Sequence, residues 1–180
     1  MTDKDFIPSI YTTDKSEGKV TYKSPSNIAL VKYWGKKEHQ IPANPSISFT
    51  LDTCATTTTV SYKKLKNKAS DFSFDLLFDG KPKEDFKPKI NTFLKRTEAY
   101  LPFLKAYHFT IETFNSFPHS SGIASSASGM SALALCLMEL ERELNPNMDA
   151  DFFKRKASFL ARLGSGSACR SIEGNWRFLW

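Results

Sequence analysis

The sequence predicts a single α+β domain in which a mixed or antiparallel β-sheet is covered by helices. Apolar residues alternate with polar ones through most of the first two thirds of the chain, which is the period of a half-buried strand. In the last third they recur at steps of three and four, which is the period of an amphipathic helix. Strands and helices do not alternate regularly, so a doubly wound parallel sheet is the weaker prediction. With 180 residues and 20.3 kDa, the chain holds one ordinary domain and hardly two complete ones.

Four strand-like segments carry this prediction. Residues 19–62 are mostly strand-like, and within them residues 45–51 alternate strictly while residues 56–62 are rich in β-branched side chains. Residues 72–78 alternate before an Asp-Gly turn signal, and residues 107–111 alternate again. The apolar positions are Ile47, Phe49 and Leu51 on one face of the first segment, then Phe72, Phe74, Leu76 and Phe78, then Tyr107, Phe109 and Ile111.

Three helices are predicted to cover the sheet. The first spans about residues 90–101, the second opens near Gly129 and runs about four turns, and the third lies between Asp149 and Leu163. The third has an acidic start and a glycine, Gly164, at its end. The inner face of the first helix would be Ile90, Phe93, Leu94, Thr97 and Leu101, and that of the second Met130, Leu133, Leu137, Leu140 and Leu144.

Composition narrows the classes of function. Hydrophobic residues make up 41% and charged residues 24%, which excludes a disordered polyelectrolyte, a collagen-like fibre and a membrane bundle. The 25 basic and 19 acidic residues give a net charge of +6, which suits nucleotides and diphosphates as well as nucleic acid. The absence of a signal-peptide pattern and of a membrane-spanning stretch predicts a cytoplasmic protein. Three widely spaced cysteines and three scattered histidines predict reduced thiols and no metal site built by the protein itself.

A Ser- and Gly-rich loop at residues 117–129 is the first candidate for chemistry. Its small residues allow a ligand to approach the backbone closely, and the hydroxyls of Ser125 and Ser126 can donate to oxygen. The helix that follows would add unpaired N–H groups and a partial positive charge, which together bind phosphate. The spacing of a Walker A loop is absent. A flexible Ser-rich loop with no ligand is the alternative.

Two further segments carry cations beside small or aromatic residues. In residues 24–37 an apolar strand leads to Lys32, Tyr33 and Lys36, which can contact phosphate oxygens through ammonium and phenol groups. In residues 164–170 alternating Gly and Ser can wrap an anion, and Arg170 presents a planar fork suited to carboxylate or phosphate. The alternatives are a solvated basic turn for the first and a plain loop after a helix for the second. Cys169 has no base near it in sequence and is interpreted as a small buried residue.

These segments, in this order, resemble the GHMP kinase superfamily and, within it, the mevalonate diphosphate decarboxylase family. Residues 118–127 match the superfamily's phosphate-loop pattern PxxxGLxSSA. The decarboxylase assignment depends on residues 27–36, which include Asn-Ile-Ala and Lys-Tyr-Trp-Gly-Lys, and on the Gly-Ser-Gly-Ser-Ala-Cys-Arg run at 164–170. Residues 44–48 are similar to the family's N-S-S-x-S stretch. The resemblance covers about residues 20–173 and implies the superfamily's N-terminal domain, of the ribosomal protein S5 domain 2-like type.

The resemblance implies an activity and a set of site residues. Members of the family use ATP, with its bound Mg²⁺, to phosphorylate the C3 hydroxyl of mevalonate 5-diphosphate, and loss of phosphate and CO₂ then leaves isopentenyl diphosphate. Lys32 and Arg170 would be catalytic. The substrate would be held by Asn27, Tyr33, Trp34, Lys36, Ser165, Gly166, Ser167 and Arg170, and ATP by Pro118, Ser120, Ser121, Gly122, Ala124, Ser125 and Ser126.

The resemblance also predicts how the chain is organised. Residues 1–18 would be an N-terminal extension, residues 19–174 the domain that carries both sets of loops, and residues 175–180 an atypical tail at a point of truncation. The family's catalytic aspartate lies in a C-terminal half that the match does not reach, so we expect low activity from these 180 residues alone. A homodimer is compatible with the superfamily.

Two other functions remain open at the level of sequence. The same phosphate loop would serve another GHMP enzyme, such as a mevalonate 3-kinase or a phosphomevalonate decarboxylase. A nucleic-acid-binding domain is the alternative of another class, because the superfamily's fold is similar to a ribosomal-protein domain and the basic charge suits phosphate contacts. The lysines are dispersed rather than arranged in a stripe, which disfavours it. We therefore expect small-molecule ligands, with no nucleic acid and no membrane.

Overall fold

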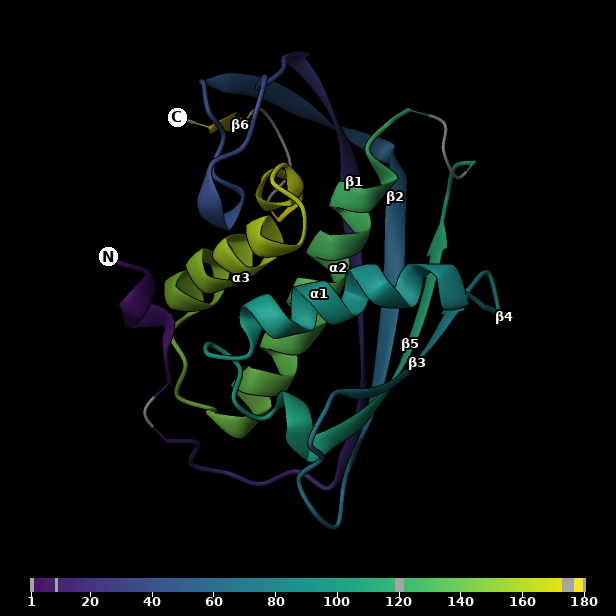
Figure 1. Ribbon diagram of the computed structural model, residues 1–180, viewed down its shortest axis with the longest axis vertical. Coiled ribbons are helices and arrows are strands. Elements are labelled where there is room, and N and C mark those ends of the chain that lie inside the picture. Colours follow the sequence, from purple (N-terminus) through teal and green to yellow (C-terminus); the bar gives the residue numbers. More distant parts are fainter. Residues whose placement is uncertain (1, 9, 119–121, 173–176, 180) are drawn as a thin grey trace.

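A computed structural model describes residues 2–8, 10–118, 122–172 and 177–179, and shows one mixed sheet with helices on one face (Figure 1). Its strands are β1 (Glu17–Val31), β2 (Ser46–Lys64), β3 (Ser73–Phe78), β4 (Lys81–Pro82), β5 (Tyr107–Asn115) and β6 (Arg177–Leu179). They lie in the order β1-β2-β5-β3-β4, and β6 pairs separately with β2. The α+β class predicted from sequence is therefore confirmed.

The sheet is antiparallel except for one pair. β1 pairs with β2 over nearly its full length, β2 pairs antiparallel with β5, and β3 runs parallel to β5. A parallel neighbour needs a crossover connection, and α1 (Lys87–Thr97) supplies it between β3 and β5. The predicted Asp79-Gly80 turn is present, with both residues at positive φ (49° and 73°) and β4 following directly.

Three long helices cover the inner face of the sheet. α2 (Ser125–Leu144) packs on β1 and β2, and α3 (Ala150–Gly164) packs on α2 and α1. Asp149 caps α3 by accepting a hydrogen bond from the Phe152 N–H, as an acidic residue before a helix predicts. Short 3₁₀ turns complete the domain: η1 (Asp3–Phe6), η2 (Glu38–Gln40), η3 (Glu84–Phe86), η4 (Leu104–Ala106) and η5 (Ala168–Ser171).

The core lies between the helices and the sheet. Phe109 and Ile111 from β5 meet Phe93 and Leu94 from α1 and the long apolar stripe of α2. The predicted inner faces of the helices are buried, although α1 ends at Thr97, before the buried Leu101. No described helix has the length and apolar character that a membrane crossing requires.

Two predicted features are corrected by the structure. α2 begins at Ser125, four residues before the predicted start, so Ser125 and Ser126 belong to its first turn. In β2 the more buried face carries Ser46 and Ser48 rather than the apolar set that includes Ile47, because this face lies over the buried end of Arg170. The predicted tail contains β6, whose backbone pairs with residues 46–48 of β2.

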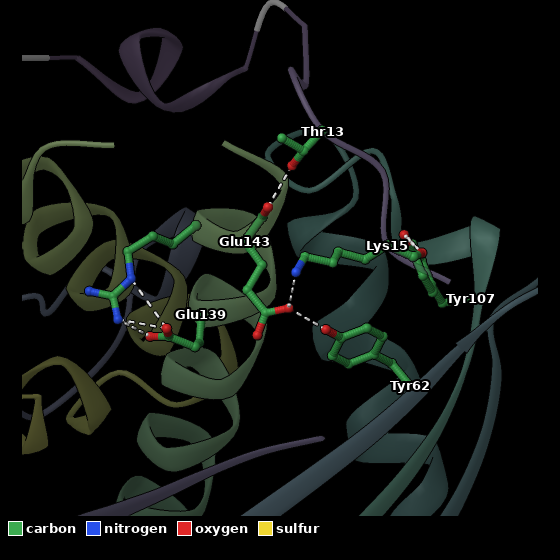
Figure 2. Close-up of polar contacts among 7 residues, drawn as sticks. Thr13, Lys15, Tyr62, Tyr107, Glu139 and Glu143 are labelled. Atoms are coloured by element: carbon green, nitrogen blue, oxygen red, sulfur yellow. Dashed lines mark hydrogen bonds and ion pairs between the residues drawn. The ribbon is translucent and has the colours of Figure 1, made fainter. Parts of the chain in front are cut away.

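The N-terminal extension packs against the end of α2 that lies farthest from the phosphate loop. The backbone N–H groups of Thr12 and Thr13 both donate to the carbonyl of Leu144, and the Thr13 hydroxyl donates to the carbonyl of Glu143 at 2.6 Å. Figure 2 shows this region, where the Tyr62 hydroxyl and the Lys15 ammonium meet the Glu143 carboxylate. These contacts satisfy carbonyls that a helix end leaves unpaired.

Candidate functional site

The three segments singled out in the sequence meet at the N-terminal end of α2. Ser26 in β1 donates from its hydroxyl to the carbonyl of Ile123 in the phosphate loop. The hydroxyls of Ser126, in the first turn of α2, and Ser165, after α3, lie 3.5 Å apart. Contacts between residues 97 and 39 positions apart in the chain therefore bring the three segments together.

The phosphate loop leaves the start of α2 open to a ligand. Gly122 and Ala124 both have positive φ, at 81° and 56°, which turns the chain sharply into the helix. No side chain caps the helix at Ala124, and no acidic residue lies in its first turn. The free N–H groups and the positive end of the helix dipole therefore remain available for an anion.

Tyr33 and Lys36 lie against the turn that follows α3. A Cβ placed on Gly166 would lie 3.0 Å from the Tyr33 hydroxyl and 3.5 Å from Cε of Lys36. The Lys36 ammonium also lies 5.9 Å from the centre of the Tyr33 ring. The absence of a side chain at Gly166 is thus what allows the lysine, the phenol and the turn to approach one another.

Arg170 is a buried cation whose hydrogen-bonding capacity is only partly used. Its side chain is 2% exposed, and Nη2 donates to the hydroxyl of Ser46. Nε and Nη1 are buried and have no hydrogen-bond partner among the described residues, and the same is true of the Ser48 hydroxyl. Burial lowers the pKa of the guanidinium, although arginine remains protonated in proteins. An anionic ligand would supply the missing partner.

Asn27 holds the segment that carries Arg170. Its side-chain amide donates to the Ser171 hydroxyl at 2.8 Å and to the carbonyl of Ser167 at 3.4 Å. The Ser24 hydroxyl, three residues earlier in β1, donates to the carbonyl of Ser171 at 2.6 Å, and its oxygen lies 2.8 Å from the Ser131 hydroxyl. β1 therefore fixes η5 in place, and Asn27 acts on Arg170 through the backbone around it.

A pocket of about 330 Å³ opens beside the phosphate loop. Ser125 and Ser126 line it together with a mostly apolar set of residues that includes Phe78, Ile90 and Met130. Asn115 lines the same pocket; its Oδ1 accepts from Thr56, while its Nδ2 is buried without a partner among the described residues. A flat apolar ligand that presents one acceptor would fit this wall.

Lys89 lines this pocket and lies near Lys36, the lysine at the Gly166 turn, and no motif in the sequence points to it. It lies in the first turn of α1 and lines the pocket together with Ser125. Burial and, to a lesser degree, the nearby Lys36 ammonium lower the pKa of Lys89. A lysine in the first turn of a helix opposes the helix dipole. That unfavourable placement is visible in the sequence and could have indicated an anion site.

Other predicted residues lie at the edge of the site or outside the described part of the chain. Trp34 is 89% exposed, and its backbone N–H donates to Asn44 Oδ1 at 2.7 Å. The Lys32 side chain is also exposed, while Asn44 donates to its carbonyl at 3.3 Å. Pro118 is exposed, and Ser120 and Ser121 fall outside the described residues. The roles of all of these remain predictions.

Among the described residues, no group of three His, Cys, Asp or Glu side chains could hold a metal ion. The three cysteines are free thiols. Cys136 is buried in the core, whereas Cys169, predicted to be buried, is only partly so, and its thiol donates to the carbonyl of Gly166. The chemistry that these residues offer is therefore binding of anions by cations, hydroxyls and backbone N–H groups.

Comparison with known families agrees with this arrangement. The sequence model described as "Diphosphomevalonate decarboxylase-like N-terminal domain" matches residues 24–179. The chain belongs to the diphosphomevalonate decarboxylase family. The match includes all three segments of the site and β6.

Alignments with individual relatives cover most of this chain but less than half of the relative's length. The diphosphomevalonate decarboxylase of Bos taurus is 34% identical over 174 residues, which are 87% of this chain and 40% of the relative. The enzyme of Homo sapiens is 32% identical, over 91% of this chain and 41% of the relative. The chain thus spans about two fifths of the length of these curated family members.

Solved structures of the family have the same fold. The crystal structure of mevalonate diphosphate decarboxylase from Staphylococcus aureus has a TM-score of 0.69 and 32% identity, over 91% of this chain and 45% of that one. A structure of MDDEF in complex with MVAPP, AMPPCP and magnesium has a TM-score of 0.67 and 36% identity, over 91% and 46%. The fold of this family's N-terminal portion is therefore confirmed for the described residues.

Proposed function

We propose that residues 20–173 form the ATP- and substrate-binding part of an enzyme that decarboxylates mevalonate 5-diphosphate to isopentenyl diphosphate. The observation that carries the proposal is Arg170, a buried guanidinium with two unpartnered nitrogens at the meeting point of three anion-binding turns. A buried cation is unfavourable unless a charged partner compensates it. The carboxylate of the substrate would be that partner.

The opposite end of the substrate is a diphosphate, and the turn at Gly166 suits it. Tyr33 and Lys36 approach this turn directly, and Ser165 and Ser167 flank it with hydroxyls. Charge-assisted hydrogen bonds are about twice as strong as neutral ones. Holding the substrate by both charged ends would fix its C3 hydroxyl between them, near Lys32. This orientation would lower the entropic part of the reaction barrier.

The residues present also fit ATP. The base would occupy the pocket of about 330 Å³, where the free Nδ2 of Asn115 can donate to a ring nitrogen. The phosphates would lie at the first turn of α2, near Ser125, Ser126 and Lys89, and Mg²⁺ would come bound to them. ATP supplies the phosphoryl group that makes the tertiary hydroxyl a leaving group.

In the decarboxylation itself, the chain's own residues act through charge. Loss of phosphate develops positive charge at C3, and the bound anionic groups stabilise it. Arg170 would hold the carboxylate until the bond between its carbon and C2 breaks; that electron pair forms the C2–C3 double bond and CO₂ leaves. Lys32 would compensate charge on the departing phosphate. The residues assigned to the site include no carboxylate that could take the proton of the C3 hydroxyl, so we expect slow turnover from this chain.

Calorimetry tests the binding part of this proposal. Wild-type chain should bind mevalonate 5-diphosphate and ADP, and Arg170→Met should lose about 30-fold or more in affinity for mevalonate 5-diphosphate, equivalent to about 2 kcal/mol for a truncated buried charge pair. Arg155→Met is the matched control, because that arginine is exposed on α3 and pairs with Asp151. Binding of neither ligand by the wild-type chain would contradict the proposal.

Labelled substrates test the reaction class. With carboxyl-labelled mevalonate 5-diphosphate and ATP, slow release of labelled CO₂ supports a decarboxylase. A phosphorylated product that keeps the carboxylate would indicate a kinase of the same superfamily instead.

A further inference from the structure

Gln40 has an unusual backbone conformation in the loop that carries Lys36. Its φ is 61°, in the left-handed region that side chains other than glycine rarely adopt. The other described non-glycine residues with positive φ are Asp79, in the tight turn between β3 and β4, and Ala124, at the start of α2. Asp is tolerated in such turns, whereas a strained glutamine beside a ligand site suggests that the conformation serves a purpose.

Backbone hydrogen bonds hold this conformation in place. The Ala43 N–H donates to the carbonyl of Gly35 at 2.9 Å, and the Lys37 N–H donates to the carbonyl of Ile41 at 2.8 Å. Gln40 ends the short turn η2, which packs against α3. The loop is thus closed by its own backbone, and the left-handed residue sets the direction of both its carbonyl and its side chain.

Both polar groups of Gln40 meet the candidate diphosphate site. The side-chain Oε1 accepts a hydrogen bond of 2.7 Å from the Lys36 ammonium. The backbone carbonyl oxygen would lie 3.2 Å from a Cβ placed on Gly166. Among the described residues no carboxylate forms an ion pair with Lys36, so a neutral amide oxygen is what holds this ammonium at the turn.

We propose that Gln40 is a positioning residue that holds the Lys36 ammonium at the Gly166 turn for a diphosphate ligand. This inference rests on the proposed function, because it assigns the ligand of the same turn. An ammonium has three donors, and Gln40 occupies one of them, which leaves two for phosphate oxygens. Because the amide is neutral, the full charge of Lys36 remains available to the ligand; a carboxylate in its place would neutralise it.

Two variants separate positioning from structural support. In Gln40→Gly the backbone keeps its conformation without strain, so the melting temperature should stay the same or rise, while affinity for mevalonate 5-diphosphate should fall about tenfold. Gln40→Glu should weaken binding further, because its carboxylate would pair with Lys36 and repel the diphosphate. Asp79→Gly is the matched control: it relieves a similar positive φ in the β3–β4 turn rather than in the loop that carries Lys36, and should leave affinity for mevalonate 5-diphosphate unchanged.

A double-mutant cycle with Lys36→Ala shows whether Gln40 acts through that lysine. Calorimetry with mevalonate 5-diphosphate and with inorganic pyrophosphate should find that Gln40→Gly has no further effect once Lys36 is absent. An equal effect in both backgrounds, or wild-type affinity in Gln40→Gly, would overturn the role of Gln40 while the proposed function stands. A wild-type chain that binds neither probe would overturn the proposed function and this inference with it.

Discussion

The two ends of α2 differ in how their charges are compensated. At the C-terminal end, three glutamates each have a partner: Glu139 with Arg142 and Tyr22, Glu143 with Tyr62 and Lys15, and Glu141 with Lys156 and Tyr11. The N-terminal segment also supplies donors to the last carbonyls of the helix (Figure 2). One oxygen, Oε2 of Glu141, remains buried without a partner among the described residues.

At the N-terminal end of α2, by contrast, the charges are not compensated. The cations Lys36, Lys89 and Arg170 gather there, and among the described residues none of them has a carboxylate partner. Gln40 and Ala124 are strained, and no side chain caps the helix. The C-terminal end of α2, which we call the closed end, therefore stabilises the fold. The N-terminal end, which we call the open end, retains unfavourable electrostatic energy that anionic ligands would relieve.

The buried ion pair at the closed end gives the largest expected effect. Lys156 and Glu141 are each 1% exposed, with 2.5 Å between Nζ and Oε1, and Lys156 also donates to the carbonyl of Tyr100 at 2.8 Å. Lys156→Met should lower the free energy of unfolding by about 3–5 kcal/mol, because it leaves a buried carboxylate without a counter-charge. Urea unfolding followed by circular dichroism measures it.

The control for this variant is Arg155→Met on the same helix. That exposed pair should contribute less than about 1 kcal/mol. Adding Glu141→Leu to Lys156→Met should restore most of the lost stability, because it removes the unpaired charge. If Lys156→Met lowers the free energy of unfolding by less than about 1 kcal/mol, the closed end does not stabilise the fold through this ion pair, which contradicts the comparison.

At the open end, Lys89→Met should act on binding rather than on stability. Loss of one charge-assisted contact of about 1.5–3 kcal/mol predicts at least a tenfold weaker affinity for ADP or for mevalonate 5-diphosphate. The free energy of unfolding should stay unchanged or rise, because a partly desolvated cation next to Lys36 is removed. Lys95→Met, in the last turn of the same helix, is the control. A lower free energy of unfolding with unchanged ligand affinity would show that Lys89 stabilises the fold, as the residues of the closed end do, and does not bind a ligand.

The smallest effect concerns alkaline pH at the closed end. Burial, followed by the hydrogen bond to Glu139, raises the pKa of Tyr22 to about 12. A raised pKa in the folded state stabilises the fold below pH 10, and this contribution is lost as pH rises from 10 to 12, because the unfolded chain ionises first. Tyr22→Phe should therefore make stability fall less steeply across that window. An unchanged slope in urea unfolding would contradict the assignment.

The fold class and most elements could be predicted from sequence because they follow from local periodicity. The alternation of residues 72–78 and the stripe of α2 are each visible within one segment. The start of α2 was placed four residues late because small serines carry little hydrophobic signal, although their backbone is helical. In residues 45–51 the alternation predicts that the apolar side chains face the core. Ser46 and Ser48 are more buried instead, because Arg170, which is distant in sequence, lies against that face.

The candidate site was predicted in part. Segments around Tyr33, Ser125 and Arg170 were recognised because small and charged residues cluster there in sequence. Lys89 and Gln40 belong to no recognised motif, and Lys89 is one of several lysines around the start of α1, so the sequence did not single them out. Their part in the site depends on the approach of Lys36 and Gly166, which lie far apart in the chain.

The sequence alone determined the class of fold, the order of its main elements and the chemical character of three candidate anion-binding segments. These depend on side-chain periodicity and residue type, which act over a few neighbours. Only the tertiary structure decided which cations share one site, which polar atoms stay unpaired and which end of α2 is closed. Those properties arise from contacts between distant segments, whose energy depends on burial and distance.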